Sequence, residues 1–238
     1  MMLIDTKYRT EAPEIMDDFL LEGEELREAL DKIAKINQLL GGNKLTIEGL
    51  KKILPKSDTN VEITIVDVGC GNGDMLRKIA DFGIKNGYNF KLLGIDANQF
   101  TINHAISLSN EYTSISYLCE DIFKMNFATL NSDIIVCTLT LHHFKESDII
   151  NILTVFKKNA KRGLVINDLQ RSAVAYRLFQ LLCLLFQLNT MSRTDGLVSI
   201  LRGFKKHELV VFSEKLNFKK YNIQWKWAFR YQWIIQNI

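Results

Sequence analysis

The sequence predicts an α/β fold: a doubly wound, mostly parallel sheet of seven strands with helices on both faces. Two observations lead to this prediction. Five short apolar runs recur between residues 63 and 168, and longer segments with helical spacing separate most of them. The C-terminal end then changes to a two-residue alternation, which predicts a closing antiparallel hairpin. A helical segment precedes the sheet.

The N-terminal segment has its own pattern. Apolar side chains at helical spacing predict a helix over residues 24–40, and Gly41 supplies its C-terminal stop. Thr46 is predicted to cap a shorter helix that ends before Pro55. A polar connector, residues 56–60, follows. The sequence thus predicts three parts: a helical segment or lid, 1–55, a main domain, 56–238, and within that domain a helical insertion at about 170–204.

The five apolar runs have the length and β-branched content of buried strands. They are Ile63–Val68, Lys91–Asp96, Ser114–Leu118, Asp133–Cys137 and Gly163–Asp168. Runs that are apolar on both faces and alternate with helices are typical of a parallel sheet with right-handed crossovers. We therefore expect a ligand beyond the carboxyl ends of these strands.

The stretch 172–188 is apolar on nearly every side of a predicted helix. Three interpretations compete: packing in the core, a face of a dimer, or a lid over an apolar substrate pocket. Core packing is the default, because a helix without a polar face is usually buried. Its apolar part, residues 178–188, is about half the roughly 20 residues that a membrane span needs, so we expect no transmembrane segment.

Aromatic side chains alternate with polar or small ones near the C-terminus. This alternation predicts two strands from about Lys219 to Gln236, with a turn near Ala228. The aromatic members are Trp225, Trp227, Phe229, Tyr231 and Trp233. Packing of this face on helices explains them, whereas stacking on nucleic-acid bases would be the alternative.

The formal net charge of +3 does not require a polyanionic partner, so we expect no nucleic acid. Nine acidic residues and one basic residue lie between Glu11 and Asp31, whereas eight basic and two acidic residues lie from Leu201 to the end. Solvated helix faces explain this best; contact between the two ends, within the chain or across a dimer, is the alternative. We expect a monomer or a homodimer.

None of the four cysteines forms a C-x-x-C pair, and all of them lie in apolar or glycine-rich runs. Buried, reduced thiols fit this pattern better than disulfides or a zinc site. The N-terminus lacks the long apolar stretch of a signal peptide. We therefore expect a cytoplasmic protein with no bound metal.

A glycine loop joins the first strand to the helix that follows it. Glycines at 69, 71 and 73 give the spacing G-x-G-x-G, and such loops present free amides to a polar ligand. The dinucleotide fingerprint, G-x-G-x-x-G, needs its third glycine where this chain has Asp74. Asp67 also places a carboxylate near the loop, which would oppose a pyrophosphate and suit a ligand with an ammonium and a sulfonium. These features disfavour an NAD-dependent oxidoreductase.

The segment 66–74 resembles motif I of the class I, S-adenosylmethionine-dependent methyltransferases, whose fold is Rossmann-like. The resemblance implies that Asp67 and the loop backbone hold the methionine part of the cofactor and that S-adenosylhomocysteine is the product. It covers residues 60–170 best. The loop residues it singles out are Gly69, Cys70, Gly71 and Gly73.

Further matches follow in the family's order. Asp96, with Ala97 beside it, ends the second strand and is similar to the acid that binds the ribose hydroxyls. Asp121 and Ile122 follow the third strand and resemble the adenine-binding motif. Thr138 ends the fourth strand, which runs toward the active site. Each acid alone also fits a turn or a helix cap; their joint order and spacing favour the family.

Three residues are candidates for catalysis. His142 and His143 follow the fourth strand, and a histidine there could deprotonate a phenol or an acidic carbon. A structural role at the strand-to-helix junction is the alternative. Asp168, at the tip of the fifth strand, could orient a histidine, bind substrate or cap a helix.

The flanks are similar to a narrower bacterial subgroup of ubiquinone/menaquinone-type methyltransferases, some of which accompany type III polyketide synthases. The segments that carry this similarity are 36–42, 168–171 with Ala175-Tyr176, and 195–204. It implies O- or C-methylation of a small lipophilic acceptor that is phenolic or quinone-like. RNA or protein methylation, and a non-catalytic cofactor-binding protein, are the alternatives.

Overall fold

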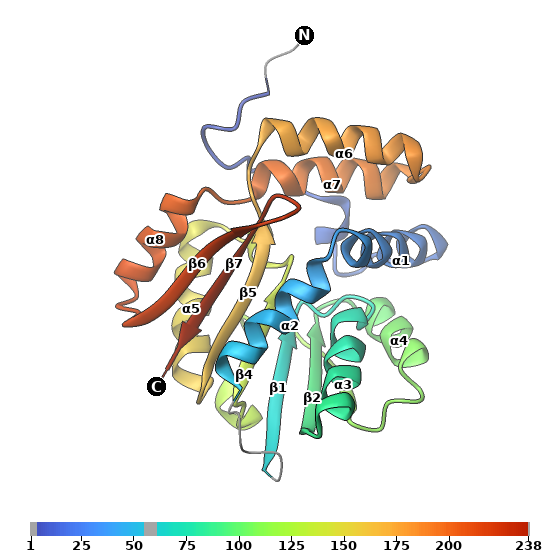
Figure 1. Cartoon of the computed structure of the whole chain (residues 1–238). Helices are drawn as coiled ribbons and strands as arrows, with labels where there is room; N and C mark the ends of the chain where they lie inside the picture. Colours follow the sequence, from blue (N-terminus) through green and yellow to red (C-terminus); the bar gives the residue numbers. More distant parts are fainter. Residues whose placement is uncertain (1–3, 55–60, 238) are drawn as a thin grey trace.

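The computed structural model describes residues 4–54 and 61–237, and its sheet confirms the predicted Rossmann-like α/β fold (Figure 1). The strands lie in the order β3-β2-β1-β4-β5-β7-β6, in which β7 is antiparallel to both neighbours. Their bounds are β1 Glu62–Val68, β2 Asn89–Asp96, β3 Ile115–Cys119, β4 Ile134–Thr138, β5 Gly163–Leu169, β6 Lys220–Lys226 and β7 Arg230–Gln236. The strands predicted from apolar runs differ from these by one or two residues at their ends.

Eight α-helices are present in the described residues. They are α1 Glu24–Leu39, α2 Gly42–Ile53, α3 Asp74–Asn86, α4 Gln99–Leu108, α5 Glu146–Asn159, α6 Ala173–Leu185, α7 Thr190–Arg202 and α8 Lys206–Lys215. Short 3-10 helices occur at η1 Ile15–Asp17, η2 Phe127–Leu130 and η3 Leu141–His143. The predicted boundary at residues 55–56 and the connector 56–60 lie outside the described residues.

The two faces of the sheet bury two separate apolar clusters. In β1, Ile63 and Ile65 pack with α2 and α3 on one face, whereas Val66 and Val68 pack with α5 and α8 on the other. This alternation follows from the two-residue period of a strand. Both faces are therefore covered, as the apolar runs predict.

Helix α2 begins earlier than the sequence predicts. Gly41, with φ of 78°, precedes the helix, so Gly42 and not Thr46 opens it. Thr46 lies inside the helix and fully buried, where its hydroxyl lies 3.2 Å from that of Thr138 and accepts a hydrogen bond from Asn167 Nδ2. The prediction that Thr46 is a helix cap was wrong because tertiary contacts hold its side chain.

Helix α6 is not part of the core. Only Ala175 and Cys183 are buried, whereas Leu181 and Leu184 on the outer side are 53% and 72% exposed. The helix packs on α7 beyond the carboxyl ends of the strands instead of against a face of the sheet (Figure 1). The default prediction of core packing was wrong, because α6 lies beyond the end of the sheet, where the protein covers only one side of the helix.

The predicted hairpin is formed by β6 and β7, but its aromatic residues do not share one packed face. Tyr231 and Trp233 are buried, whereas Trp225 and Trp227 are 49% and 61% exposed. Trp225 lies on the edge strand, and its Nε1 donates to Gln170 Oε1. Position at the edge of the sheet and in the turn, which the alternation does not reveal, keeps these two indoles exposed.

The acidic and basic ends of the chain meet within the molecule. Arg202 of α7 lies 2.9 Å from an Asp17 carboxylate oxygen and 3.3 Å from Glu14 Oε1. The two ends thus meet at Arg202, whereas Glu24, Glu25, Lys215 and Lys219 are exposed, as the favoured interpretation of solvated helix faces predicts. All four cysteines are free, and Cys119 is only partly buried. Within the described part of the chain, no helix has the length and hydropathy of a membrane span.

Candidate functional site

A cavity of about 740 Å³ lies at the carboxyl ends of the strands, and residues of α1, α6 and α7 help to line it. Most residues predicted to form the site line it. These are Asp67, Gly69, Cys70, Gly71, Asp96, Ala97, Asp121, Ile122, Thr138, His142 and His143. Gly73 and Asp168 do not reach the wall: Gly73 opens α3, and Asp168 lies behind His142.

The glycine loop has the backbone that its sequence predicts. Gly69, Gly71 and Gly73 all have positive φ, between 51° and 76°. A Cβ on Gly73 would lie 2.0 Å from the hydroxyl oxygen of Tyr117, so this position requires glycine for both its conformation and its packing. The loop therefore turns tightly into α3 and leaves its other side open to the cavity.

Asp67 is a buried carboxyl group without a counterion. It is 1% exposed, and none of the described residues hydrogen-bonds its Oδ1. Burial, with the nearby charges of Asp96 and Asp74, raises the pKa of Asp67 to about 8. A cationic group in the cavity would relieve this cost, so the site fits a ligand that carries an ammonium.

Asp96 is held at the end of β2 by backbone donors. The N–H groups of Gly71 and Asn98 each lie 3.1 Å from one of its carboxylate oxygens. Burial raises its pKa. The carboxylate thus lies between the glycine loop and the cavity, where it can accept further hydrogen bonds from hydroxyl groups.

Asp121 differs from the other two acids because it has its own partners. The Phe123 N–H donates to Oδ1 at 3.0 Å, and Lys124 Nζ lies 3.0 Å from Oδ2. Burial raises the pKa of Asp121, but these two donors lower it by more, so the pKa lies below its ordinary value. Ile122 follows it on the cavity wall and offers an apolar surface.

The N-terminal helices bind the glycine loop directly, which the sequence patterns did not predict. Gln38 of α1 and Asn43 of α2 both donate to the Asp74 carboxylate at the start of α3. Asn37 Nδ2 donates in turn to Asn43 Oδ1. The resemblance over 36–42 marked this stretch, but only the fold shows that its amides fix the loop.

His142 is oriented by Asp168. Its Nδ1 lies 2.7 Å from Asp168 Oδ1, and its backbone N–H donates to Oδ2 at 3.2 Å. Asp168 carries a lowered pKa: burial raises it, but the contact with His142 outweighs this effect. Among the described residues, His142 Nε2 has no hydrogen-bond partner, although the ring is 3% exposed. A hydrogen on Nδ1 therefore leaves a lone pair on Nε2, which lies 3.9 Å from Glu14 Oε1.

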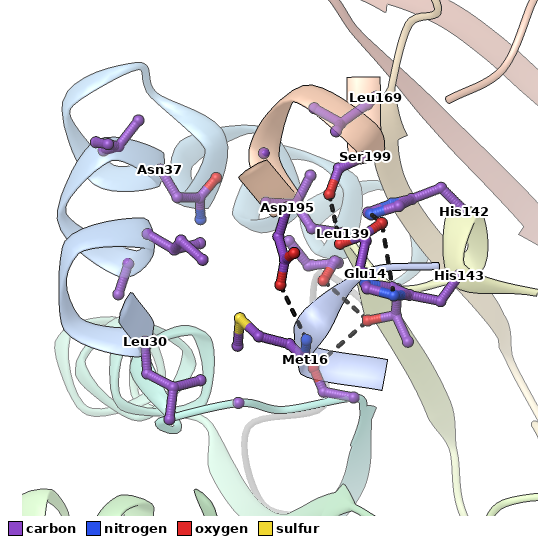
Figure 2. A pocket seen from close by; sticks show the side chains of 18 of the residues that line it. Glu14, Met16, Leu30, Asn37, Leu139, His142, His143, Leu169, Asp195 and Ser199 are labelled. Atoms are coloured by element: carbon purple, nitrogen blue, oxygen red, sulfur yellow. Dashed lines mark hydrogen bonds and ion pairs between the residues drawn. The ribbon is translucent and has the colours of Figure 1, made fainter. Parts of the chain in front are cut away.

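Glu14 and His143 complete this wall (Figure 2). Ser199 donates to Glu14 Oε2, and His143 Nδ1 lies 2.8 Å from Asp17. Burial lowers the pKa of His143, but Asp17 and Glu14 raise it more. Nitrogens of both histidines and an oxygen of Glu14 lie within 4.8 Å of one another, a spacing found in metal sites. Arg202 already neutralises Glu14, so this cluster does not lead us to propose a metal.

The rest of the cavity is apolar and far larger than the acidic wall. Side chains from α1, α6 and α7 and from the tip of the β6–β7 hairpin form it. They include Leu26, Leu30, Ile33, Leu178, Phe179, Leu182, Ile200, Trp227 and Phe229. The inner side of α6 lines the cavity, which agrees with the interpretation of this apolar helix as a lid.

The comparisons with known proteins agree with this geometry. Residues 65–163 match the family model described as a methyltransferase domain. No curated protein matches the chain. Among solved structures, the plantazolicin methyltransferase BpumL in complex with S-adenosylhomocysteine has a TM-score of 0.67 at 16% identity, covering 88% of this chain and 89% of its own.

Two further structures share the fold. A SAM-dependent methyltransferase from Aquifex aeolicus has a TM-score of 0.63 at 16% identity, covering 91% of this chain and 100% of its own. Magnesium protoporphyrin IX methyltransferase from Synechocystis PCC 6803, with bound S-adenosylhomocysteine, has a TM-score of 0.55 at 14% identity and covers 82% of each chain.

Residues 65–163 thus form a methyltransferase domain, and the fold is that of solved methyltransferases. The solved structures of this fold named above include two with bound S-adenosylhomocysteine. These findings agree with the family, the enzyme class and the cofactor that the resemblance implied. The narrower bacterial subgroup stays a prediction.

Proposed function

We propose that this enzyme methylates oxygen or carbon of a small, lipophilic acceptor that is phenolic or quinone-like. The observation that carries the proposal is the His142 imidazole, which lines a largely apolar cavity and whose buried Nε2 has no hydrogen-bond partner in the described residues. A neutral imidazole there can take a proton from a weakly acidic hydroxyl or carbon.

The residues predicted for the cofactor have matching surroundings. The uncompensated Asp67 carboxyl would bind the ammonium of the methionine part, and the open backbone of Gly69, Cys70 and Gly71 would lie against it. Gly73 would support this loop through its fit against Tyr117. Asp96, beside Ala97, would accept from the ribose hydroxyls.

Two further groups would complete the cofactor site. Asp121 would accept from the adenine amino group, with Ile122 against the ring. Thr138 lines the cavity at the end of β4, next to the Thr46 hydroxyl. The Asp121 carboxylate stays ionised, since its pKa is lowered, and it is therefore an acceptor at neutral pH.

The cofactor, when bound, would supply a methyl group carried on its sulfonium. This methyl group would be transferred to the acceptor by in-line substitution. Alignment of the acceptor in the cavity would supply much of the rate, an effect worth roughly 7–11 kcal/mol in favourable cases. His142 would remove the acceptor's proton through Nε2, and Asp168 would stabilise the resulting imidazolium. His143, already hydrogen-bonded to Asp17, would have a supporting role.

The apolar wall supports a small lipophilic acceptor. Leu178 and Phe179 of α6 and Leu30 of α1 enclose the space above the glycine loop, as a lid would. We extend this to the whole N-terminal segment 1–55, which we propose as part of the lid. Relatives of the same fold were solved with plantazolicin analogues or are named for magnesium protoporphyrin IX, which agrees with a small-molecule acceptor.

Methyl transfer to a panel of simple phenols and naphthols, followed by mass spectrometry, tests the proposal. We expect at least one phenol to gain 14 Da, and we expect His142→Gln to slow this transfer about 10²–10⁴-fold without changing the affinity for S-adenosylhomocysteine. Full activity of His142→Gln, of His143→Gln and of the double variant would remove histidine from the mechanism. Binding of the cofactor without methylation of any phenol would refute the acceptor class.

RNA methylation has less support. The exposed Trp225 and Trp227 are available for stacking, but carboxylates and apolar side chains dominate the cavity wall. A phosphate backbone would be repelled there. Binding of single-stranded RNA that weakens steeply with added salt would favour this alternative over a small acceptor.

A further inference from the structure

Arg230, the first residue of β7, is a buried cation without a partner. Its side chain lines the cavity although the residue is only 3% exposed. Its Nε and Nη1 have no hydrogen-bond acceptor in the described residues, and no ion pair to Arg230 is found among them. A buried charge without a partner is costly, so an unpaired guanidinium at a cavity wall points to a ligand.

A second buried arginine shows how this fold normally satisfies such a group. Arg171 is fully buried, and its guanidinium donates to both Glu208 carboxylate oxygens and to the carbonyl oxygens of Thr6, Lys7 and Gly203. Every side of Arg171 is thus occupied by the protein. Arg230 has none of these contacts.

Arg230 remains charged at neutral pH. Burial lowers its pKa to about 10, and Asp168 partly opposes the effect. The Asp168 carboxylate, which is hydrogen-bonded to the imidazole and the backbone of His142, acts on Arg230 through its charge but forms no ion pair or hydrogen bond with it in the described structure. The positive charge is therefore present in the cavity and uncompensated at close range.

Gly42 lets Arg230 and Asn37 pack closely against the backbone: a Cβ there would lie 3.1 Å from Arg230 Cζ and 1.9 Å from Asn37 Oδ1. Asn37 Oδ1 is itself a buried acceptor that no described residue satisfies, and Asn37 also lines the cavity. An unpaired donor and an unpaired acceptor thus lie near the same glycine.

This corner is linked to the glycine loop. The Asn37 amide donates to Asn43, and Asn43 donates to Asp74 at the start of α3. Arg230 therefore lies in the cavity at the end of a short chain of side chains that begins at the loop proposed to hold the methionine part of the cofactor.

We propose that Arg230 is the anion-binding residue of the cavity and that it receives a carboxylate or a phenolate oxygen. Two sources have this chemistry: the carboxylate of the cofactor's methionine part and an acidic oxygen of the acceptor. Arginine suits either, because its planar fork binds such oxygens with charge-assisted hydrogen bonds. The inference rests on the proposed function and adds to it a residue from β7, far in sequence from the glycine loop.

Binding titrations of the full chain with two matched probes separate the sources. S-adenosylhomocysteine carries the amino-acid carboxylate, whereas 5′-methylthioadenosine lacks the amino-acid part. If the cofactor is the source, Arg230→Gln weakens S-adenosylhomocysteine about tenfold or more, as the loss of a charge-assisted hydrogen bond predicts, and leaves 5′-methylthioadenosine unchanged.

The second titration tests the acceptor as the source of the anion and uses protein saturated with S-adenosylhomocysteine. If the acceptor is the source, Arg230→Gln weakens 2-naphthoate about tenfold or more, leaves the neutral 2-naphthamide unchanged and does not alter the affinity for S-adenosylhomocysteine. Unchanged affinity of the variant for both anionic probes would overturn the inference. Failure of the unaltered protein to bind S-adenosylhomocysteine would instead overturn the proposed function.

Thermal unfolding without ligand distinguishes binding from a structural role. Because no described residue hydrogen-bonds Nε or Nη1 of Arg230, Arg230→Gln should melt at the same temperature as the unaltered protein or above it. Arg171→Gln, the control, should melt lower because it leaves Glu208 and three carbonyl groups without their donor. A large loss of stability in Arg230→Gln with unchanged ligand affinity would show a structural arginine.

Discussion

The Asp168 carboxylate holds His142 at two points: Oδ1 lies 2.7 Å from the imidazole Nδ1, and Oδ2 accepts the backbone N–H at 3.2 Å. Both groups are buried. The side-chain contact fixes which nitrogen carries the hydrogen, and the backbone contact anchors the second residue of η3. The pair thus sets the tautomer of the ring and the position of its other nitrogen, Nε2.

Asp168→Asn should keep the shape of this pair and damage its chemistry. An amide cannot stabilise an imidazolium, and it can present its NH₂ group to Nδ1 and thereby favour the wrong tautomer. We expect kcat to fall about 10²–10⁴-fold, with little change in the affinity for S-adenosylhomocysteine. Steady-state kinetics and calorimetric titration check this; a kcat within twofold of the unaltered enzyme would mean that the pair is structural.

Binding of the cofactor should release a proton from Asp67. Its pKa of about 8 means that the group is mostly protonated at pH 7 before binding. An ammonium placed against it favours the carboxylate, so affinity should rise with pH up to about 8, with release of about one proton at pH 7. Calorimetry in buffers of different ionisation enthalpy measures this number, and Asp67→Asn should reduce it to near zero.

The same shift makes a prediction for the ligand-free protein. The folded-state pKa of Asp67 lies above its ordinary value of 3.8, so the folded protein binds more protons than the unfolded chain between these two values. The contribution of this group to the stability of the fold therefore falls as the pH rises from about 4 to 8, because the unfolded chain has lost this proton and the folded protein still holds it. Asp67→Asn should flatten that part of the stability curve, and an unchanged slope would contradict the shift.

Gly73 and Gly87 form a matched pair of glycines at the two ends of α3. Both have positive φ, 76° and 71°, but a Cβ on Gly73 would collide with Tyr117, whereas one on Gly87 would meet nothing within 4 Å. Gly87→Ala should cost only the backbone strain, about 1–2 kcal/mol in the free energy of unfolding, and keep cofactor binding. Gly73→Ala should cost more and weaken S-adenosylhomocysteine.

Denaturant unfolding and titration of the two glycine variants provide the comparison. Equal losses of stability and equal cofactor affinities in both would show that backbone strain alone explains Gly73. That result would argue against a packed loop that positions the cofactor.

Leu182 and Leu184 test the two sides of α6. Leu182 lines the cavity, whereas Leu184 is 72% exposed on the outer side. In protein saturated with S-adenosylhomocysteine, Leu182→Ala should weaken 2-naphthol binding about tenfold, the usual effect of lost apolar contact in a pocket, and Leu184→Ala should have no effect. Fluorescence titration measures both. Equal behaviour of the two variants would exclude a lid role for α6.

Much of the fold could be predicted because it follows from local patterns. The β-branched runs gave five strands within two residues, and the glycine spacing gave the turn from β1 into α3. Predictions failed where a side chain's surroundings come from distant parts of the chain. Thr46 is buried against β4 instead of capping a helix, and Trp227 is exposed in a turn although Tyr231 and Trp233 of the same alternation are buried.

By itself, the sequence determined the order of the strands along the chain, the glycine loop and the family, because these depend on short-range spacing of residue types. Only the tertiary structure decided that Glu14 from the N-terminal segment lies close to His142 and that Gln38 and Asn43 donate to Asp74 beside the loop. It also decided that Arg230 lines the cavity with its Nε and Nη1 unsatisfied by the described residues. The physical reason is that a charge or an amide is satisfied by whichever partners folding brings within about 3 Å, and no periodicity in the sequence records those partners.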